Sequence, residues 1–284
     1  MGIKSQGGPG GASTPIFNWR FGSTGTDASD PPPIVYPTCS GAHNTPSGAS
    51  HFWDWSYSHD DQVGSVDFDS NTTQMALNDS SQGIAPPPGW GCGGYGRIAT
   101  KAASAGGIYR TSQGSIPNYS AGDWTFDICV YVGASNNPAT TAWMPYTVNN
   151  DGETYGMVHY WPAGDTTDLR MDTVNSDFNG RLGETGSLGG VPTLNKWCVL
   201  RFRYDGSNWK NETYVPNGSN TGWTGLGSVT TTKTAGSQPD PSNGEGRILL
   251  NSFGTHVRGY GKDNVHYAWA AFYPNDTASV YVPS

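Results

Sequence analysis

Apolar and polar residues alternate most clearly in residues 195–206, which read NKWCVLRFRYDG. In an extended chain, one side carries the apolar residues Cys198, Leu200, Phe202 and Tyr204. The opposite side carries Trp197, Val199, Arg201 and Arg203. This alternation, closed by Asp-Gly, predicts a strand followed by a turn, and residues 208–217 are predicted to be the returning strand. We therefore expect the first side to lie on a buried core.

Similar short apolar stretches recur along the chain and are separated by turn-forming residues. They predict strands at residues 16–21, 122–132, 143–148, 154–161, 169–174, 247–253 and 265–273. Residues 78–96 and 175–194 are predicted to be loops because of their Gly and Pro residues, and residues 218–245 are a stretch rich in Thr, Ser and Gly. No stretch shows a sustained helical period with caps, so the predicted fold class is an all-β sandwich of two antiparallel sheets.

Length and charge limit the domain organisation and the classes of partner. The 284 residues fit one large sandwich domain, residues 15–284, which is clearest from residue 122 onward. Residues 1–14 form a Gly-rich arm that is either flexible or held by an assembly. Only 13% of residues are charged and the net charge is −8, which argues against a nucleic-acid partner. The N-terminus lacks the apolar core of a signal peptide, and no apolar run predicts a membrane span.

The four cysteines do not have the C-x-x-C spacing of a metal site. Cys39 and Cys92 lie in Gly/Pro-rich loops, where they either pair as a disulfide or stay reduced. Cys129 and Cys198 lie in predicted strands, where buried free thiols are the commoner outcome.

The densest aromatic cluster is residues 51–59, HFWDWSYSH. Alternation places Trp53, Trp55 and Tyr57 on one side, where the rings form either a sugar-stacking platform or part of a sandwich core or subunit contact. The acidic residues nearby are Asp54, Asp60, Asp61, Asp67 and Asp69. They are either Ca²⁺ ligands or solvated loop carboxylates, and their spacing does not match an EF-hand. No other cofactor is indicated, and no metal-binding residues are assigned.

Four segments in the second half of the chain carry a resemblance to a known fold family. They read GDWTFDICVYV (122–132), NKWCVLRFRYDGSNWKNETYVPNG (195–218), RILLNSF (247–253) and VHYAWAAFY (265–273). Their order resembles the concanavalin A-like jelly roll shared by legume lectins, laminin G-like modules and several polysaccharide lyases. The resemblance covers about half the chain and implies a jelly-roll sandwich. It does not imply one function, because this fold serves many.

Three further segments are similar to motifs of alginate-lyase-type and glucuronan-lyase-type enzymes: residues 109–111, 157–159 and 267–273. The resemblance implies that His159 with Tyr267 or Tyr273 supplies the base and acid of a β-elimination, and that Arg110 or Arg170 neutralises the uronate carboxylate.

Three departures from the lyase motifs argue against an intact lyase. Met157 stands where those enzymes have Gln, Trp269 stands where they have Lys, and the segment around Arg110 lacks its Glu. A substituted descendant that binds glycans or serves structurally fits these changes better.

Two functions remain as hypotheses. The first is a structural or adhesive surface subunit, such as a virion decoration, fibre or tail protein, with itself or other structural subunits as partners and a virion or extracellular surface assembly as its location. Its candidate glycan-binding residues are Trp53, Trp55, Tyr57, Trp161, Arg201 and Arg203. The second is a polysaccharide lyase acting on a uronate-containing glycan. The side that carries Arg201 and Arg203 is either a site for an anionic glycan or acidic neighbour, or a solvated, ion-paired outer face.

Overall fold

The structure is a computed structural model. It describes residues 35–69, 75–100, 109–111, 123–132, 143–150, 155–161, 170–175, 181–185, 195–232, 246–251, 263–275 and 277–284. The Gly-rich arm at 1–14 and the predicted strand at 16–21 lie outside this part of the chain.

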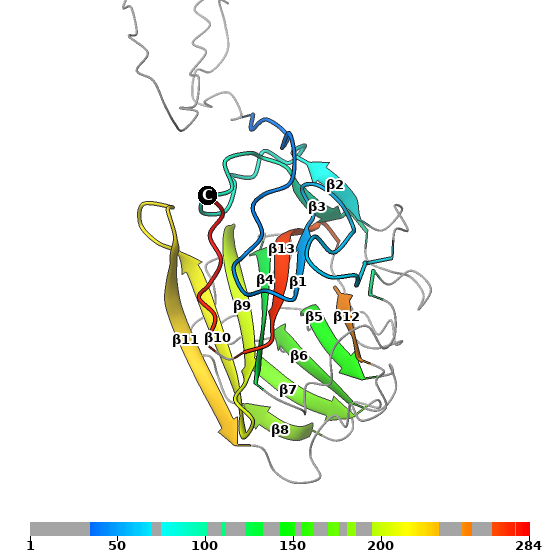
Figure 1. Cartoon of the computed structure of the whole chain (residues 1–284), viewed down its shortest axis with the longest axis vertical. Helices are drawn as coiled ribbons and strands as arrows, with labels where there is room; N and C mark the ends of the chain where they lie inside the picture. The colour runs from blue at the N-terminus through cyan, green and yellow to red at the C-terminus, as the bar shows by residue number, and fades with distance from the viewer. Residues whose placement is uncertain are drawn as a thin grey trace, which may run out of the picture.

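Two antiparallel sheets form the described part of the molecule (Figure 1). The large sheet has the order β11-β10-β9-β4-β13-β3-β2, with β1 paired beside β13. Its strands, in that order and ending with β1, are Trp223–Thr232, Asn208–Pro216, Lys196–Tyr204, Trp124–Val132, Val265–Tyr273, Tyr95–Ile98, Ala76–Asp79 and His51–Asp54. The small sheet has the order β12-β5-β6-β7-β8. Its strands are Gly246–Leu250, Trp143–Asn150, Tyr155–Trp161, Arg170–Asn175 and Arg181–Thr185.

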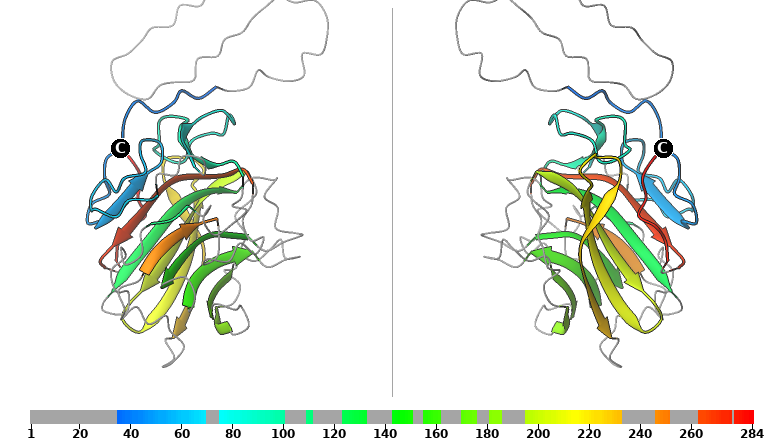
Figure 2. Two further views of the ribbon diagram at one scale, coloured as in Figure 1. Left: turned by 90° about the vertical axis from the view of Figure 1, so that its right-hand side faces the viewer. Right: turned by 90° about the vertical axis from the view of Figure 1, so that its left-hand side faces the viewer.

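The strand pairing is nested in the way that defines a jelly roll. The strand β4 pairs with β13 in the large sheet, and the next strand, β5, pairs with β12 in the small sheet. The chain thus wraps around the core with its early and late strands side by side, and the two sheets lie as layers (Figure 2). The predicted all-β sandwich of two antiparallel sheets is confirmed.

Strands β2, β3, β8 and β11 were not predicted, because β2, β3 and β8 are only four or five residues long and β11 is rich in Gly and Thr. The loops predicted at 78–96 and 175–194 are corrected accordingly, since each contains or overlaps a strand, and β11 lies in the stretch at 218–245 that is rich in Thr, Ser and Gly. Pairing with a neighbouring strand supplies the backbone hydrogen bonds that fix these segments, whatever their local preference. The hairpin predicted around Asp-Gly is confirmed, with Gly206 at a φ of 82° between β9 and β10.

The inner face of the large sheet forms the core between the sheets. The predicted apolar side of β9 is buried there and consists of Cys198, Leu200, Phe202 and Tyr204. It belongs to the same cluster as Ile248 and Leu250 of β12. Full burial of an apolar side chain of this size stabilises the fold by about 1.5–3 kcal/mol. The prediction that this side faces the core is confirmed.

The outer face of the large sheet is also covered. A second cluster joins Trp197 and Val199 of β9 to Cys39, Trp90 and Tyr281, which come from segments outside the sheets. In Figure 1 the C-terminal tail, residues 277–284 in red, runs along the sheet at β9 and β10. One predicted alternative was a solvated, ion-paired outer face. The outer face does contain an ion pair, but most of it is covered by other segments and not by solvent.

Candidate binding pocket

A pocket of about 480 Å³ opens on the outer face of the large sheet. Its strand residues are Arg201, Arg203, Tyr214 and Trp223, from β9, β10 and β11. Its tail residues are Thr277, Ala278, Ser279, Val280 and Val282. This volume lies within the range of about 300–1,000 Å³ that is typical of small-molecule sites.

A buried ion pair lies at the base of the pocket. Asp127 and Arg201 are opposite each other on β4 and β9, so their side chains share one face. Arg201 donates from Nε to Asp127 Oδ1 and from Nη2 to Oδ2, both at 2.6 Å. Its third nitrogen, Nη1, donates to the Ala278 carbonyl at 2.7 Å. Arg201 therefore fastens the tail to the sheet and has little capacity left for a ligand.

The charge state of Arg201 follows from this contact. Burial alone would lower the pKa of its guanidinium, but the adjacent Asp127 carboxylate outweighs burial and the pKa is raised. The residue is thus a fixed cation, neutralised by its partner. The guanidinium carbon also lies 5.5 Å from the centre of the Tyr214 ring, a cation–π contact that orients this ring at the pocket wall.

Two aromatic residues border the pocket. Tyr214 and Trp223 are half-buried, so part of each ring remains accessible. The Trp223 indole Nε1 donates to the Tyr281 carbonyl at 2.9 Å, which holds the indole against the tail. Sequence reasoning missed both aromatic residues as site residues, although the predicted β10 strand contains Tyr214.

Arg203, which lines the pocket, belongs to a charge cluster with an excess of positive charge. Arg203 Nε lies 3.0 Å from Glu212 Oε2, and Lys210 Nζ lies 2.9 Å from Glu212 Oε1. Burial alone would raise the pKa of Glu212, but Lys210 and Arg203 outweigh burial and the pKa is lowered. One carboxylate thus faces two cations, and of these Arg203 lines the pocket. Both predicted arginines line the pocket, but Arg201 is held by Asp127 and the tail, whereas Arg203 lies beside Glu212.

The aromatic platform predicted at residues 51–59 is not a surface. Trp53 and Trp55 have no exposed area and pack in the core between the sheets, and the Trp53 indole donates to the Val66 carbonyl at 2.6 Å. The strand ends at Asp54, so Tyr57 lies in a turn with 54% of its area exposed. A glycan therefore cannot stack on Trp53 or Trp55. The structure agrees with the alternative that these rings form part of the core. Trp161 ends β6, and its side chain lies outside the described part.

The residues of the lyase resemblance are not brought together in the described part. Tyr267 lies in the inner core, whereas Tyr273 lies in the outer cluster. Simple alternation would put both on one face, but the pairing of β13 with β4 shifts register between Tyr267 and Ala270. Both tyrosines are at most 1% exposed. Arg110 forms an isolated bridge with Leu249, and the side chain of His159, in β6, lies outside the described part.

The acidic residues near the aromatic cluster hold loops in place. The Asp61 carboxylate accepts from His51 Nδ1 at 2.6 Å and from the backbone N–H groups of Phe52, Val63, Gly64 and Val66. Burial opposes the ionised form, but these donors outweigh burial and lower the pKa of Asp61 to about 2. Such a carboxylate is occupied by protein donors. This arrangement favours a structural role over Ca²⁺ binding.

The four cysteines are of two kinds, two joined in a disulfide and two that remain free thiols. Cys39 and Cys92 form a disulfide, which is one of the two predicted alternatives. Cys129 and Cys198 are buried free thiols, as predicted, and burial raises the pKa of each. Among the described residues, Cys39, His43 and Cys92 also place ligand atoms within 4.8 Å of one another.

No protein-family model and no curated protein sequence matches the chain. Solved structures do. A protein of unknown function from Shewanella oneidensis MR-1 has a TM-score of 0.46 and 12% identity over 81% of this chain and 88% of that chain. The exoplasmic/lumenal domain of VIP36, in its Ca²⁺/Man3GlcNAc-bound form, has a TM-score of 0.45 and 12% identity over 83% and 97%.

A third solved structure is domain 4 of AbnA, a GH43 extracellular arabinanase from Geobacillus stearothermophilus, in complex with arabinotriose. It has a TM-score of 0.45 and 10% identity over 81% of this chain and 94% of that chain. Similarities at this level assign no function to the chain. Within the described residues, we find no helix with the length and apolarity needed to cross a membrane.

Proposed function

We propose that the chain is a carbohydrate-binding β-sandwich, that its ligand occupies the outer-face pocket, and that the ligand carries a carboxylate. The observation that carries the proposal is the grouping of Trp223, Tyr214 and Arg203 around one open pocket. An aromatic ring offers a flat apolar surface for the C–H face of a sugar, and a guanidinium fork matches the geometry of a carboxylate. Exposed Thr277 and Ser279 add hydroxyl groups for hydrogen bonds to the ligand.

The net charge of −8 makes the local charge at the pocket informative. An anionic ligand is repelled by the protein as a whole, so its capture depends on a local excess of cations. Arg203 and Lys210 supply that excess around the single carboxylate of Glu212. This arrangement favours a uronate-containing glycan over a neutral one.

The test compares two variants that remove the same charge. Arg203→Gln and Lys210→Gln each delete one cation that pairs with Glu212, but only Arg203 lines the pocket. We expect the wild-type protein to bind uronate oligosaccharides more tightly than neutral ones, measured by calorimetry. Arg203→Gln should weaken binding about tenfold or more, in line with the loss of a charged hydrogen bond, whereas Lys210→Gln should change it about twofold. No binding to either glycan class, or equal effects of the two variants, would reject the proposal.

We also propose that the chain serves as an adhesive subunit of a larger assembly. The scarcity of charge and the Gly-rich arm at residues 1–14 support this role, since such an arm can order against a neighbouring subunit. Light scattering of the full chain tests it. A species larger than 30.2 kDa, lost when residues 1–14 are deleted, is expected. A monomer at all accessible concentrations would contradict it.

A further inference from the structure

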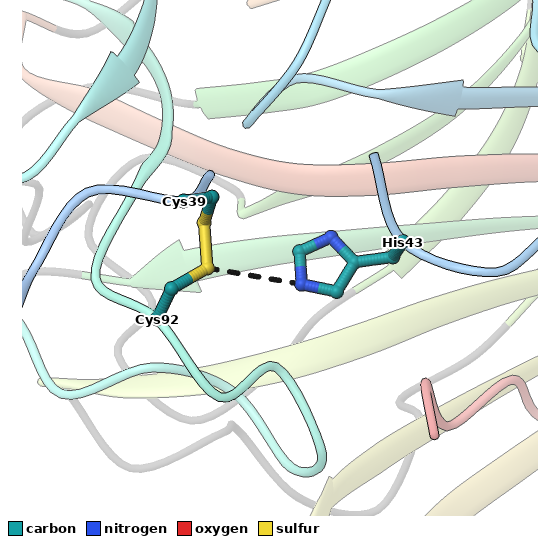
Figure 3. Close-up of side chains that lie close together, drawn as sticks. All are labelled: Cys39, His43 and Cys92. Carbon is teal, nitrogen blue, oxygen red and sulfur yellow. Dashed lines mark hydrogen bonds between the residues drawn. A yellow bond between two sulfur atoms is a disulfide. The ribbon is translucent and has the colours of Figure 1, made fainter. Parts of the chain in front are cut away.

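The Cys39–Cys92 disulfide lies beside His43, and the three side chains converge on one point (Figure 3). His43 Nε2 is 3.8 Å from Cys92 Sγ. Two separate loops supply the cysteines, and Asn78 fixes the first by pairing with its backbone. Its Oδ1 accepts from Cys39 N at 2.8 Å and its Nδ2 donates to Cys39 O at 2.9 Å. The backbone of the first sulfur ligand is therefore held in position independently of the disulfide.

His43 is oriented by a buried carboxylate. Its Nδ1 lies 2.9 Å from Asp54 Oδ2, and Asp54 has no exposed area. Asp54 is fixed in turn by Ser56, whose N and Oγ donate to Oδ1 at 2.9 and 2.6 Å. The His43 ring also stacks on Trp90 with the ring centres 3.6 Å apart. Metal-binding histidines usually donate the proton of their other ring nitrogen to a carboxylate or carbonyl in this way, which fixes the orientation of the ring.

We propose that reduction of the Cys39–Cys92 disulfide creates a Zn²⁺ site made of the two cysteine thiolates and His43 Nε2, with water in the fourth position. Two sulfurs and one imidazole suit a soft or borderline ion such as Zn²⁺ and do not suit Ca²⁺ or Mg²⁺. With Zn–S bonds of about 2.3 Å, a tetrahedral ion needs the sulfurs roughly 3.8 Å apart. The two sulfurs must therefore move apart to this distance once the S–S bond is broken. In the disulfide form the Cα atoms of the two cysteines are 5.1 Å apart.

The reaction balances with a thiol reductant. Two equivalents of a thiol such as glutathione give up two electrons and two protons, which break the S–S bond and leave two cysteine thiols and one disulfide of the reductant. Zn²⁺ then displaces one proton from each thiol into solvent, and the Nε2 proton that His43 donates to the Trp90 carbonyl leaves as well. In the disulfide state His43 Nε2 is 2.8 Å from the Trp90 carbonyl, and this hydrogen bond is exchanged for the bond to the metal.

The proposed site would cross-link the segments that cover the outer face in either redox state. The disulfide joins the loop at Cys39 to the loop at Cys92, and both cysteines belong to the cluster that covers the large sheet. A bound Zn²⁺ joins the same loops when the disulfide is reduced.

The test measures metal content in both redox states. The full chain, reduced with a phosphine and then desalted without oxygen, is titrated with ZnCl₂ and analysed by inductively coupled plasma mass spectrometry. We expect one Zn²⁺ per reduced chain and none per oxidised chain. Replacing Zn²⁺ with Co²⁺ should give thiolate-to-cobalt charge-transfer bands of two thiolates. No metal in the reduced chain, or equal metal in both states, would overturn the proposal.

Variants identify the ligands. His43→Gln should weaken Zn²⁺ binding at least tenfold, and Cys39→Ser should abolish the two-thiolate spectrum. His51→Gln is the matched control, because His51 also contacts a buried carboxylate, Asp61, at 2.6 Å but is not in the metal-ligand group. Binding by His43→Gln that equals the wild type would overturn the site. If that variant does not fold, X-ray absorption of the Zn²⁺ form of the wild type decides: a spectrum without the multiple scattering of an imidazole ring rejects His43 as a ligand.

Discussion

The two faces of the large sheet are built on the same alternation but are buried in different ways. The inner face of β9 packs apolar side chains against the small sheet. The outer face of the same strand buries a charged residue, Arg201, which is 1% exposed. Apolar packing needs shape and volume, whereas a buried charge needs one particular partner in one particular place. The inner face of β9 is therefore secured by many interchangeable apolar contacts, including some from outside the strands such as Val66 and Phe68, whereas Arg201 on the outer face depends on Asp127 and on the C-terminal tail.

The strongest test of this contrast is removal of one partner of the buried ion pair. Arg201→Met leaves the Asp127 carboxylate without the two hydrogen bonds of 2.6 Å that it receives. We expect the free energy of unfolding to fall by about 3–5 kcal/mol, the usual result of leaving a buried charge uncompensated. Urea denaturation at neutral pH measures this change.

The double variant Asp127→Leu/Arg201→Met is the control. Because it removes both charges, we expect it to recover most of the lost stability. If the double variant is as unstable as Arg201→Met, apolar contacts of the side chains, and not the charges, account for the loss.

A second test uses pH to act on a buried histidine of the outer face. His266 is 3% exposed, and neither ring nitrogen has a hydrogen-bond partner among the residues that the structure describes. Burial, together with the positive charge of Arg97, lowers the pKa of His266 to about 4, although Asp79 opposes this. Between pH 6.5 and 4 the unfolded chain binds a proton that the folded chain excludes, so stability falls as pH falls. The loss reaches about 3 kcal/mol at the lower end of this range.

His266→Phe provides the comparison. The ring should still fit edge-on against Tyr95, whose ring centre is 5.2 Å from that of His266. We expect urea midpoints of the variant to decline less than those of the wild type between pH 7 and pH 4.5. Because the pKa of Asp61 is near 2, Asp61 does not titrate in this window. Parallel declines of the two proteins would show that His266 is not the titrating group.

The smallest expected effect concerns the tail. The Tyr281 hydroxyl donates to the Asn44 carbonyl, and Ser284 N donates to Asn44 Oδ1 at 3.0 Å. Tyr281→Phe removes one hydrogen bond and should cost about 0.5–1.5 kcal/mol. Hydrogen exchange should show faster exchange of residues 277–284, with β9 unchanged. Equal acceleration in β9 would mean that the tail and the sheet open as one unit.

Much of the sandwich was predictable because its central strands carry strong alternation. Residues 122–132, 195–204 and 265–273 were all predicted as strands, and β4, β9 and β13 lie at the middle of the large sheet. The edge strands β2 and β11 were not predicted. A strand at an exposed edge needs few apolar residues, because it is ordered by pairing with its neighbouring strand. The strength of the sequence signal thus follows burial.

The candidate site was predicted only in part. Arg203 was identified by its place on the polar side of β9, but Trp223 lies in a Gly/Thr-rich stretch and the tail has no pattern that points to a sheet. The opposite orientations of Tyr267 and Tyr273 depend on the bulge within β13, which no local residue marks. Contacts between segments distant in the chain decide all of these features, so alternation alone cannot reveal them.

The position of β13 sets the order in which the molecule is completed during synthesis. This strand pairs with β4, β3 and β1, yet it leaves the ribosome after all of them and after every strand from β5 to β12. Until it arrives, β4 presents an unpaired edge with an apolar side. Such an edge can capture a strand of another nascent chain. We therefore expect the large sheet to close only after translation has passed residue 273, in a slow step dominated by long-range contacts.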